Sequence, residues 1–394
     1  MTTTINNEHK KLNVPNLRFP EFQGEWDKCK FRDVCSISTG NKNTQDKIDD
    51  GIYPFYVRSQ TVERINSWTF DGEAILTAGD GVGVGKVFHH TYGKIGVHQR
   101  VYILSDFKCD ANYLFHFFSS KFYNRVKRMS AKNSVDSVRK EMITDMPLSL
   151  PSHQEQVKIG YLLSLLDERI ATQSKIIDKL QSLIKGLEDN LLDNPLWEKT
   201  YLRSFMQFFS TNSLSWEQLS YKEGAIRNLH YGLIHGFQTR GINSASLPMI
   251  KNEAIPKQYT LCQVGDVAFA DASEDTGEIA KSVEFVDTIE GDTICGLHTI
   301  HGRDIKNRTV VGFKGFAFNS RYFHNQIKRL AQGTKVFSIT ANNLSSCYVY
   351  LPDLEKQKAI VKLLRSYEEQ LIIGRMILKQ YEKQKQYLLR QMFI

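Results

Sequence analysis

Two stretches of the chain carry apolar residues spaced alternately four and three positions apart. The first stretch holds Ile159, Leu163, Leu166, Ile170, Ile177, Leu180, Ile184, Leu187 and Leu191, with Gln173 in its one polar slot. The second holds Ile360, Leu364, Tyr367, Leu371, Leu378, Tyr381, Leu388 and Met392, and is interrupted at Gly374 and Lys385. A sustained period of about 3.5 residues is typical of a coiled-coil seam. Two long helices are therefore predicted, over residues 151–193 and 352–394. The interruptions at Gly374 and Lys385 are expected to weaken the second seam.

The two helices belong to a longer repeat. Trp26 and Trp216 open similar segments, and from Ser119 onward the two copies align at a constant offset, with Leu150-Pro151 matching Leu351-Pro352. Residues 41–118 and 233–319 lie between these conserved positions and barely resemble each other. A repeated framework with divergent middles predicts two copies of one scaffold that bind different ligands.

The segments before each helix have a mixed pattern. Residues 96–104 alternate and are rich in β-formers, residues 73–77 and 266–270 are typical of short buried strands, and residues 112–128 are aromatic and helical. The predicted fold class is α+β, with two globular domains in tandem, each followed by a long helix. The predicted divisions are a tail over 1–15, domains over 16–150 and 194–351, and helices over 151–193 and 352–394.

We expect the two helices to pair antiparallel, because a duplicated unit closes most simply by pseudo-two-fold symmetry. Two alternatives remain open from the sequence. Each helix could instead bury its apolar stripe against its own domain, or the chain could dimerise through the helices.

Composition narrows the functional class. The chain is 41% hydrophobic and 24% charged, with no long apolar stretch and no signal-peptide pattern at its start, so a cytoplasmic protein without a membrane role is expected. The net charge of +8 favours polyanionic partners, of which DNA is the commonest. The six cysteines are scattered without a C-x-x-C pair, which indicates neither a disulfide framework nor a zinc knuckle.

Three segments resemble catalytic motifs but lack their essential residues. Residues 79–86 are glycine-rich and end in Lys86, yet Val87 stands where a phosphate-binding loop needs Ser or Thr. Asp193-Asn194-Pro195-Leu196-Trp197 lacks the second proline of a methyltransferase motif. Pro352-Asp353-Leu354-Glu355-Lys356 crowds its carboxylates into one helical turn, where they complement the helix dipole. The histidines show no metal-binding spacing. No catalytic, cofactor-binding or metal-binding residue is predicted.

Basic residues recur at equivalent places in the two copies and are predicted to bind DNA phosphates. They are Arg125, Lys127, Arg128, Lys132 and Arg139 in the first copy and Lys328, Arg329 and Lys335 in the second. Base contacts are expected in the divergent middles, where side chains with suitable donors and acceptors occur. The candidates are Lys42, Arg58, Gln60, Lys86, His98 and Arg100, then His235, Arg240, Lys281, His298 and Arg303. The competing interpretation is an ordinary solvated basic face.

The layout resembles the specificity subunit of Type I restriction-modification enzymes over essentially the whole chain. The resemblance rests on Leu17-Arg18-Phe19-Pro20 through Trp26, residues 79–86, the duplication with its two heptad helices, and the two helix starts at Pro151–Gln156 and Pro352–Lys358. It implies two target-recognition domains that bind the halves of a split, asymmetric double-stranded DNA site. It also implies spacer helices that dock two methyltransferase subunits, with restriction (motor-nuclease) subunits joining for cleavage.

In such complexes S-adenosylmethionine, ATP and Mg²⁺ belong to the partner subunits, so the resemblance implies no cofactor on this chain and no catalysis by it. Two other functions remain open from the residues alone. One is a coiled-coil adaptor without a DNA role, and the other is a self-contained DNA methyltransferase or nuclease.

Overall fold

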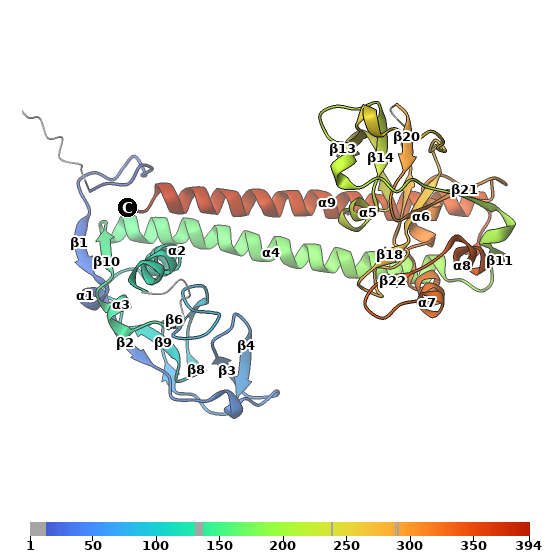
Figure 1. The fold of residues 1–394 in the computed structure, drawn as a ribbon. Helices are drawn as coiled ribbons and strands as arrows, with labels where there is room; N and C mark the ends of the chain where they lie inside the picture. The colour runs from blue at the N-terminus through green and yellow to red at the C-terminus, as the bar shows by residue number, and fades with distance from the viewer. Residues whose placement is uncertain (1–12, 131–136, 238, 288, 290) are drawn as a thin grey trace, which may run out of the picture. The chain divides into compact units, whose positions relative to one another are not determined.

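The computed structural model describes residues 13–130, 137–237, 239–287, 289 and 291–394 (Figure 1). It divides into two compact units. Unit 1 comprises the described residues up to Gln173 together with Ile377–Ile394, and unit 2 comprises Ser174–Met376. The divisions fall inside two long helices, α4 (His153–Leu192) and α9 (Leu354–Gln391), because each globular part packs on the nearby halves of both. The two helices lie within the ranges predicted from the heptads.

The globular part of unit 1 is built on two four-stranded sheets. The strand order in one sheet is β2 (Ser36–Thr39), β9 (Val101–Ser105), β6 (Ala74–Ala78) and β7 (Phe88–Thr91). The order in the other is β4 (Val62–Ile65), β3 (Tyr53–Tyr56), β8 (Lys94–Val97) and β5 (Phe70–Asp71). A separate antiparallel pair joins β1 (Asp27–Lys30) to β10 (Pro147–Leu150), directly before α4. The helices are α1 (Phe31–Val34), α2 (Ala111–Met129) and α3 (Lys140–Thr144).

The alternating stretch expected over residues 96–104 is two strands rather than one. β8 ends at Val97 and β9 begins at Val101, and a turn between them is closed by the Val101 N–H donating to the His98 carbonyl at 2.9 Å. The two strands belong to different sheets. The alternation of apolar and polar residues continues across the turn and therefore does not reveal that the chain changes sheet here. The aromatic helix predicted over 112–128 is confirmed as α2, and the strand predicted over 73–77 is confirmed as β6.

The globular part of unit 2 is also built on two larger sheets. The strand order in the five-stranded sheet is β12 (Met206–Phe209), β21 (Thr299–Asp304), β17 (Val267–Ala270), β19 (Ser282–Phe285) and β15 (Gly241–Ile242). The order in the four-stranded sheet is β13 (Leu219–Ser220), β16 (Met249–Ile250), β14 (Ile226–Leu229) and β20 (Thr293–Cys295). Two smaller pairs join β18 (Ala272–Ser273) to β22 (Phe337–Ser338) and β11 (Glu198–Tyr201) to β23 (Tyr348–Leu351). The helices are α5 (Tyr231–Gly236), α6 (Phe313–Ala317), α7 (Arg321–Leu330) and α8 (Ala341–Ser346). The fold class is therefore α+β, as predicted.

Within each unit, α4 and α9 run antiparallel. In unit 1 the start of α4 contributes Ile159 and Leu163 to the same core as Met392 and Phe393, which follow the end of α9. In unit 2 the end of α4 contributes Leu192 to the core that holds Ile360 and Leu364 near the start of α9. Buried apolar contact of this kind is the main stabilising contribution to long helix pairs.

Lys385 does not simply weaken the seam. Its Nζ forms an ion pair with Asp167 of α4, and both side chains are partly buried. The heptad pattern had suggested a defect because Lys385 occupies an apolar slot, but a carboxylate on the facing helix accepts the charge. Gly374, the other interruption, is buried within unit 2.

The repeat is visible in the way each helix is attached. In unit 1 the Gln156 amide donates to the Pro151 carbonyl at 2.8 Å and accepts from the Asp110 N–H at 2.9 Å. In unit 2 the Gln357 amide donates to the Pro352 carbonyl at 3.0 Å and accepts from the Val310 N–H at 3.0 Å. One glutamine thus satisfies backbone groups of both the helix start and the neighbouring loop in each copy. Within the described residues, no helix is both long and apolar enough to cross a membrane.

Candidate nucleic-acid interface

A glycine-rich loop over residues 79–86 connects β6 to β7 in unit 1. Gly81 and Gly85 have φ values of +76° and +66°, which favour glycine. A Cβ on Gly83 would lie only 2.4 Å from the Arg58 carbonyl oxygen, so this position also requires glycine. The Val138 N–H donates to the Gly79 carbonyl at 2.7 Å. The loop therefore packs closely against several segments that are distant in sequence.

Asp80 of this loop holds two of the predicted base-contacting arginines. Its carboxylate lies 2.9 Å from Arg58 Nη1 and 3.7 Å from Arg100 Nε. The Arg58 and Arg100 side chains remain 44% and 65% exposed. A carboxylate that holds exposed guanidinium groups in place reduces the conformational entropy lost when they bind a ligand.

His98 contacts the backbone of one of these arginines, Arg100. Its ring is buried, and Nδ1 accepts a hydrogen bond from the Arg100 N–H at 3.0 Å. Burial and the nearby Arg58 charge lower the pKa of His98, which favours the neutral ring. Lys42 is joined to His98 by a backbone bridge, and Gln60 is exposed in the turn between β3 and β4.

Lys86 connects the loop to α2, since its Nζ lies 5.5 Å from the centre of the Tyr123 ring. The structure thus gathers Lys42, Arg58, Lys86, His98 and Arg100 around one loop, and we call this set the glycine-loop cluster. Its members come from four separate places in the sequence, because His98 and Arg100 belong to one turn. Lys86 belongs to the loop itself, Arg58 and Arg100 pair with its Asp80, and the buried His98 connects Lys42 to Arg100.

The basic residues predicted to bind phosphate in unit 1 differ in their surroundings. Lys127 and Arg128 are exposed in the last turn of α2, and Arg139 is exposed directly before α3. Arg125 is less available, because its Nε donates to the Met142 carbonyl at 2.7 Å and burial lowers its pKa. Lys132 lies outside the described residues.

Unit 2 contains a cleft of about 720 Å³ lined by three of the predicted residues, Arg240, Lys281 and Lys328. Arg321 and His324 line it as well. The lining also includes carboxylates, among them Glu188, Glu278 and Glu368.

Two carboxylates hold the other predicted residues near this part of unit 2. Glu278 lies 2.9 Å from Lys281 Nζ and 3.4 Å from His235 Nδ1. Asp271 lies 3.0 Å from Nδ1 of His298, whose backbone has a φ of +53°. Arg329 and Lys335 are exposed at the end of α7 and in the segment after it.

Arg240 connects the globular part of unit 2 to both long helices. Its Nε lies 3.8 Å from Glu188 of α4, and its N–H donates to Glu368 of α9 at 3.2 Å. Burial raises the pKa of Glu188 and raises the pKa of Glu368 to about 7, although the Arg240 charge opposes both shifts. The structure thus places Arg240 at a joint between the long helices and the globular part of unit 2, and a base contact by Arg240 stays a prediction.

Arg303 also has an internal partner. Its Nε and Nη2 donate to the two oxygens of Asp266 at 2.8 and 2.7 Å, and its guanidinium lies over the Phe209 ring. Burial would raise the pKa of Asp266, but the hydrogen bonds from Arg303 and His301 outweigh it and hold the pKa low. A bidentate pair fixes the guanidinium, and a base contact by Arg303 stays a prediction.

One cluster in unit 2 was not predicted from the sequence. Cys262, Cys295 and His301 are all buried, and their potential ligand atoms lie within 4.8 Å of one another. Their spacing along the chain matches no short metal-binding motif, so only the folded arrangement reveals the cluster.

Comparison with known proteins identifies the family. The sequence model of the Type I restriction modification DNA specificity domain matches residues 23–182 and 298–383. These ranges make up more than half of the 394 residues, and the chain therefore belongs to this family. Specificity subunits are the non-catalytic members of their complexes, in agreement with the non-enzymatic role expected from the resemblance.

Individual relatives agree with this assignment. The Type I restriction enzyme EcoDI specificity subunit of Escherichia coli is 26% identical over 168 residues, which are 43% of this chain and only 37% of that subunit. The MjaVIII specificity subunit of Methanocaldococcus jannaschii is 25% identical over an alignment of 401 residues that covers 94% of this chain and 91% of that subunit.

Solved structures show the same fold at low sequence identity. The crystal structure of the Type I restriction-modification S subunit from M. genitalium superposes with a TM-score of 0.65 at 14% identity, covering 97% of this chain and 99% of that one. A chain from work on the assembly and conformational transition of the type I restriction-modification system gives a TM-score of 0.54 at 12% identity, covering 94% and 97%.

Proposed function

We propose that the chain recognises a split, asymmetric site in double-stranded DNA, with the globular part of each unit contacting one half of the site. The observation that carries this proposal is that the two units attach their helices in the same way but differ in the residues around their loops. The two units attach their helices through equivalent glutamines, Gln156 and Gln357, yet they carry different side chains around their loops. A common frame with different contact residues suits a protein that reads two unrelated half-sites.

The proposed partners are two methyltransferase subunits, which dock on the long helices, and restriction subunits that act as motor and nuclease. S-adenosylmethionine, ATP and Mg²⁺ are assigned to these partners and not to this chain. The proposed location is the cytoplasm, where the host DNA lies. The similarity to a chain taken from work on assembly of the type I system supports the partner assignment.

Arginines of the glycine-loop cluster provide the test. Arg58→Ala and Arg100→Ala each remove an exposed guanidinium held by Asp80. A bidentate arginine contact to guanine contributes roughly 1–3 kcal/mol of discrimination. We expect each variant, assembled with its methyltransferase subunits, to lose preference at one or two positions of one half-site and to keep the other half unchanged. Binding to randomised DNA followed by sequencing measures this.

Lys28→Ala is the matched control, because Lys28 is an exposed cation on β1 of the same unit. It should leave both half-sites unchanged. If Arg58→Ala and Arg100→Ala also leave every base preference unchanged, the glycine-loop cluster does not read DNA. If the assembled wild-type protein binds DNA without sequence preference, the proposal of half-site recognition is wrong and an adaptor role is favoured.

A further inference from the structure

Cys262, Cys295 and His301 come from different parts of unit 2 and meet in its interior. Cys295 ends β20 of the four-stranded sheet, and His301 lies in β21 of the five-stranded sheet. Cys262 follows Leu261, which forms a backbone bridge to Ile294. The three side chains are only 6%, 2% and 1% exposed. The cluster therefore lies where the two sheets of unit 2 approach each other.

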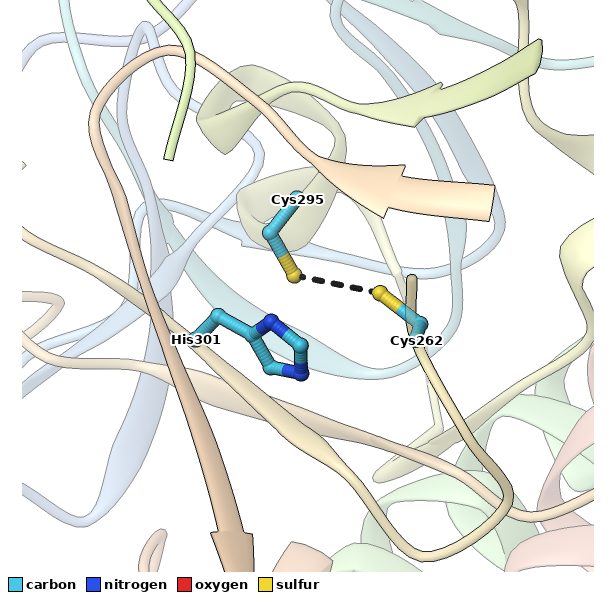
Figure 2. A group of neighbouring side chains, drawn as sticks. All are labelled: Cys262, Cys295 and His301. Atoms are coloured by element: carbon cyan, nitrogen blue, oxygen red, sulfur yellow. Dashed lines mark hydrogen bonds between the residues drawn. The ribbon is translucent and has the colours of Figure 1, made fainter. Parts of the chain in front are cut away.

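The separations match those between ligands of one metal ion. The sulfurs of Cys262 and Cys295 are 3.6 Å apart, and the three potential ligand atoms lie within 4.8 Å of one another. Two thiolates bound to tetrahedral Zn²⁺ at about 2.3 Å each would be roughly 3.8 Å apart. Figure 2 shows the two sulfurs pointing toward each other, with the His301 ring beside them.

His301 is oriented as a metal-binding histidine usually is. Its Nε2 lies 2.7 Å from Asp266, whose carboxylate also accepts from Arg303 and from the Gln263 N–H. A carboxylate held in its charged form keeps the proton on Nε2, so the lone pair of the neutral ring is on Nδ1. The charges of Asp266 and Arg303 balance each other. The hydrogen bond from His301 Nε2 to Asp266 holds the other ring nitrogen, Nδ1, on the side of the sulfurs.

We propose that Cys262, Cys295 and His301 bind one thiophilic divalent cation, best matched by Zn²⁺, and that the bound ion cross-links the two sheets of unit 2. On binding, both thiols release their protons to solvent and bind as thiolates. Two thiolates and one divalent ion carry no net charge together, which makes the site compatible with its buried position. This inference does not depend on the proposed recognition of DNA.

The fourth ligand position is available to water. Cys295 and His301 also line a cavity of about 280 Å³ whose other walls include the polar residues Ser210, Thr211 and Asn212. The Asn212 amide donates to the Cys295 carbonyl at 3.0 Å, which fixes this wall. Three protein ligands and a water complete a tetrahedral set.

A disulfide between Cys262 and Cys295 is the competing outcome. It would use the two sulfurs alone, would require an oxidant, and would give no role to the oriented His301 ring. Metal binding uses all three side chains and the Asp266 carboxylate behind them, so the arrangement favours the metal.

Metal content and spectroscopy test the proposal on the full chain. The chain is produced in zinc-supplemented medium, purified under reducing conditions, and analysed by plasma mass spectrometry. We expect about one zinc per chain. Exchange for Co²⁺ should give the intense visible bands of a tetrahedral ion and a thiolate charge-transfer band in the near ultraviolet. Removing the metal with a chelator should lower the unfolding temperature, and adding Zn²⁺ should restore it.

Variants separate a specific site from adventitious binding. Cys295→Ser and His301→Gln should lose the metal and the cobalt bands. Cys347→Ser serves as the control, because Cys347 is a buried cysteine of the same unit outside the cluster, and it should keep both. If Cys295→Ser does not fold, the wild-type chelation experiment still decides. Substoichiometric zinc in the wild type, an octahedral cobalt spectrum, or a Cys262–Cys295 disulfide in its intact mass would each overturn the proposal.

Discussion

At the scale of single residues, carboxylates determine which basic side chains can meet a ligand. Asp80 holds Arg58 and Arg100 but leaves both guanidinium groups substantially exposed. Asp266 instead accepts from Nε and Nη2 of Arg303, in a pair that is almost entirely buried on the acid side. The same type of contact therefore leaves two guanidinium groups open to solvent and accompanies the burial of most of a third. The difference lies in the burial of the acid, since a buried carboxylate needs its partner to stay paired.

Lys127 and Arg128 give the prediction at this scale. Both are exposed at the end of α2, where their charges also complement the helix dipole. If both contact phosphates, Lys127→Ala combined with Arg128→Ala should weaken binding to all DNA sequences similarly and reduce the salt slope by up to about two. Binding titrations at several salt concentrations measure the slope.

The control for this pair is Lys28→Ala combined with Lys108→Ala, which removes the same charge from two other exposed positions of unit 1. It should leave the slope unchanged. An unaltered slope in the α2 variant would mean that these two cations are ordinary solvated surface.

At the scale of elements, Arg240, Glu188 and Glu368 form the joint between the long helices and the globular part of unit 2. Glu188 lies beside the Arg240 guanidinium, whereas Glu368 accepts a hydrogen bond from the Arg240 backbone N–H. Two neighbouring buried carboxylates with one cation between them favour the protonated form of one acid. Burial and the neighbouring Glu188 raise the pKa of Glu368 to about 7, against the opposing effect of Arg240. Its ordinary value is 4.5.

This shift predicts a pH-dependent stability of unit 2. Between these two pKa values the folded protein keeps a proton that the unfolded chain has released, so the free energy of unfolding falls as the pH rises. The loss is at most about 3 kcal/mol, from roughly 1.4 kcal/mol per pKa unit. Glu368→Gln stays neutral, and we expect it to be more stable than wild type by about 1–3 kcal/mol near pH 8 and nearly equal near pH 4.5. Urea unfolding across this range is the measurement.

Glu369→Gln is the matched control, because Glu369 is the exposed neighbour on the same helix. It should leave the pH profile as in wild type. A Glu368→Gln variant that follows the wild-type profile at all pH values would show that Glu368 remains ionised in the joint.

The elements themselves could be predicted from sequence, because local periodicity encodes them. The 3.5-residue pattern placed both long helices, and the aromatic run over 112–128 placed α2. The change of sheet between β8 and β9 could not be read, since a turn at residues 98–100 leaves the alternation nearly intact. A local pattern reports which face a residue occupies but not which sheet it joins.

The candidate sites depended on contacts that the sequence does not encode locally. The basic residues of the glycine-loop cluster were predicted individually, but Asp80, which pairs with both Arg58 and Arg100, was not. Arg240 and Arg303 were expected to contact bases for the same reason, and their acids lie far away along the chain. Side-chain type predicts what a residue can bind, whereas its fold neighbours decide what it does bind.

At the scale of the whole molecule, the chain is a duplicated frame joined through continuous helices. The two compact units divide α4 after Gln173 and α9 after Met376, so each unit keeps its own share of both helices. A change of helix length at these divisions is therefore expected to leave the contacts inside each unit in place. Under the proposed function, that length sets the gap between the two half-sites.

The last prediction tests this independence. Inserting one heptad after Gln173 and another after Met376 falls at the unit divisions and preserves the apolar period, because seven residues restore the seam. Each helix lengthens by roughly 10 Å, close to three base pairs at about 3.4 Å each. Both half-sites should stay the same, while the unspecified gap between them widens by about one to three base pairs. Methylome sequencing of cells that carry the variant with its partner subunits provides the readout.

A paired insertion of four residues at the same positions is the control. It adds comparable chain but breaks the seam, because four residues do not restore the 3.5-residue period. It should abolish modification rather than shift the gap. If the heptad variant leaves the gap unchanged, or alters the bases that are recognised, then the helices do not set the spacing. Recognition would in that case depend on contacts that reach across the unit divisions, and the two half-sites could not be read independently.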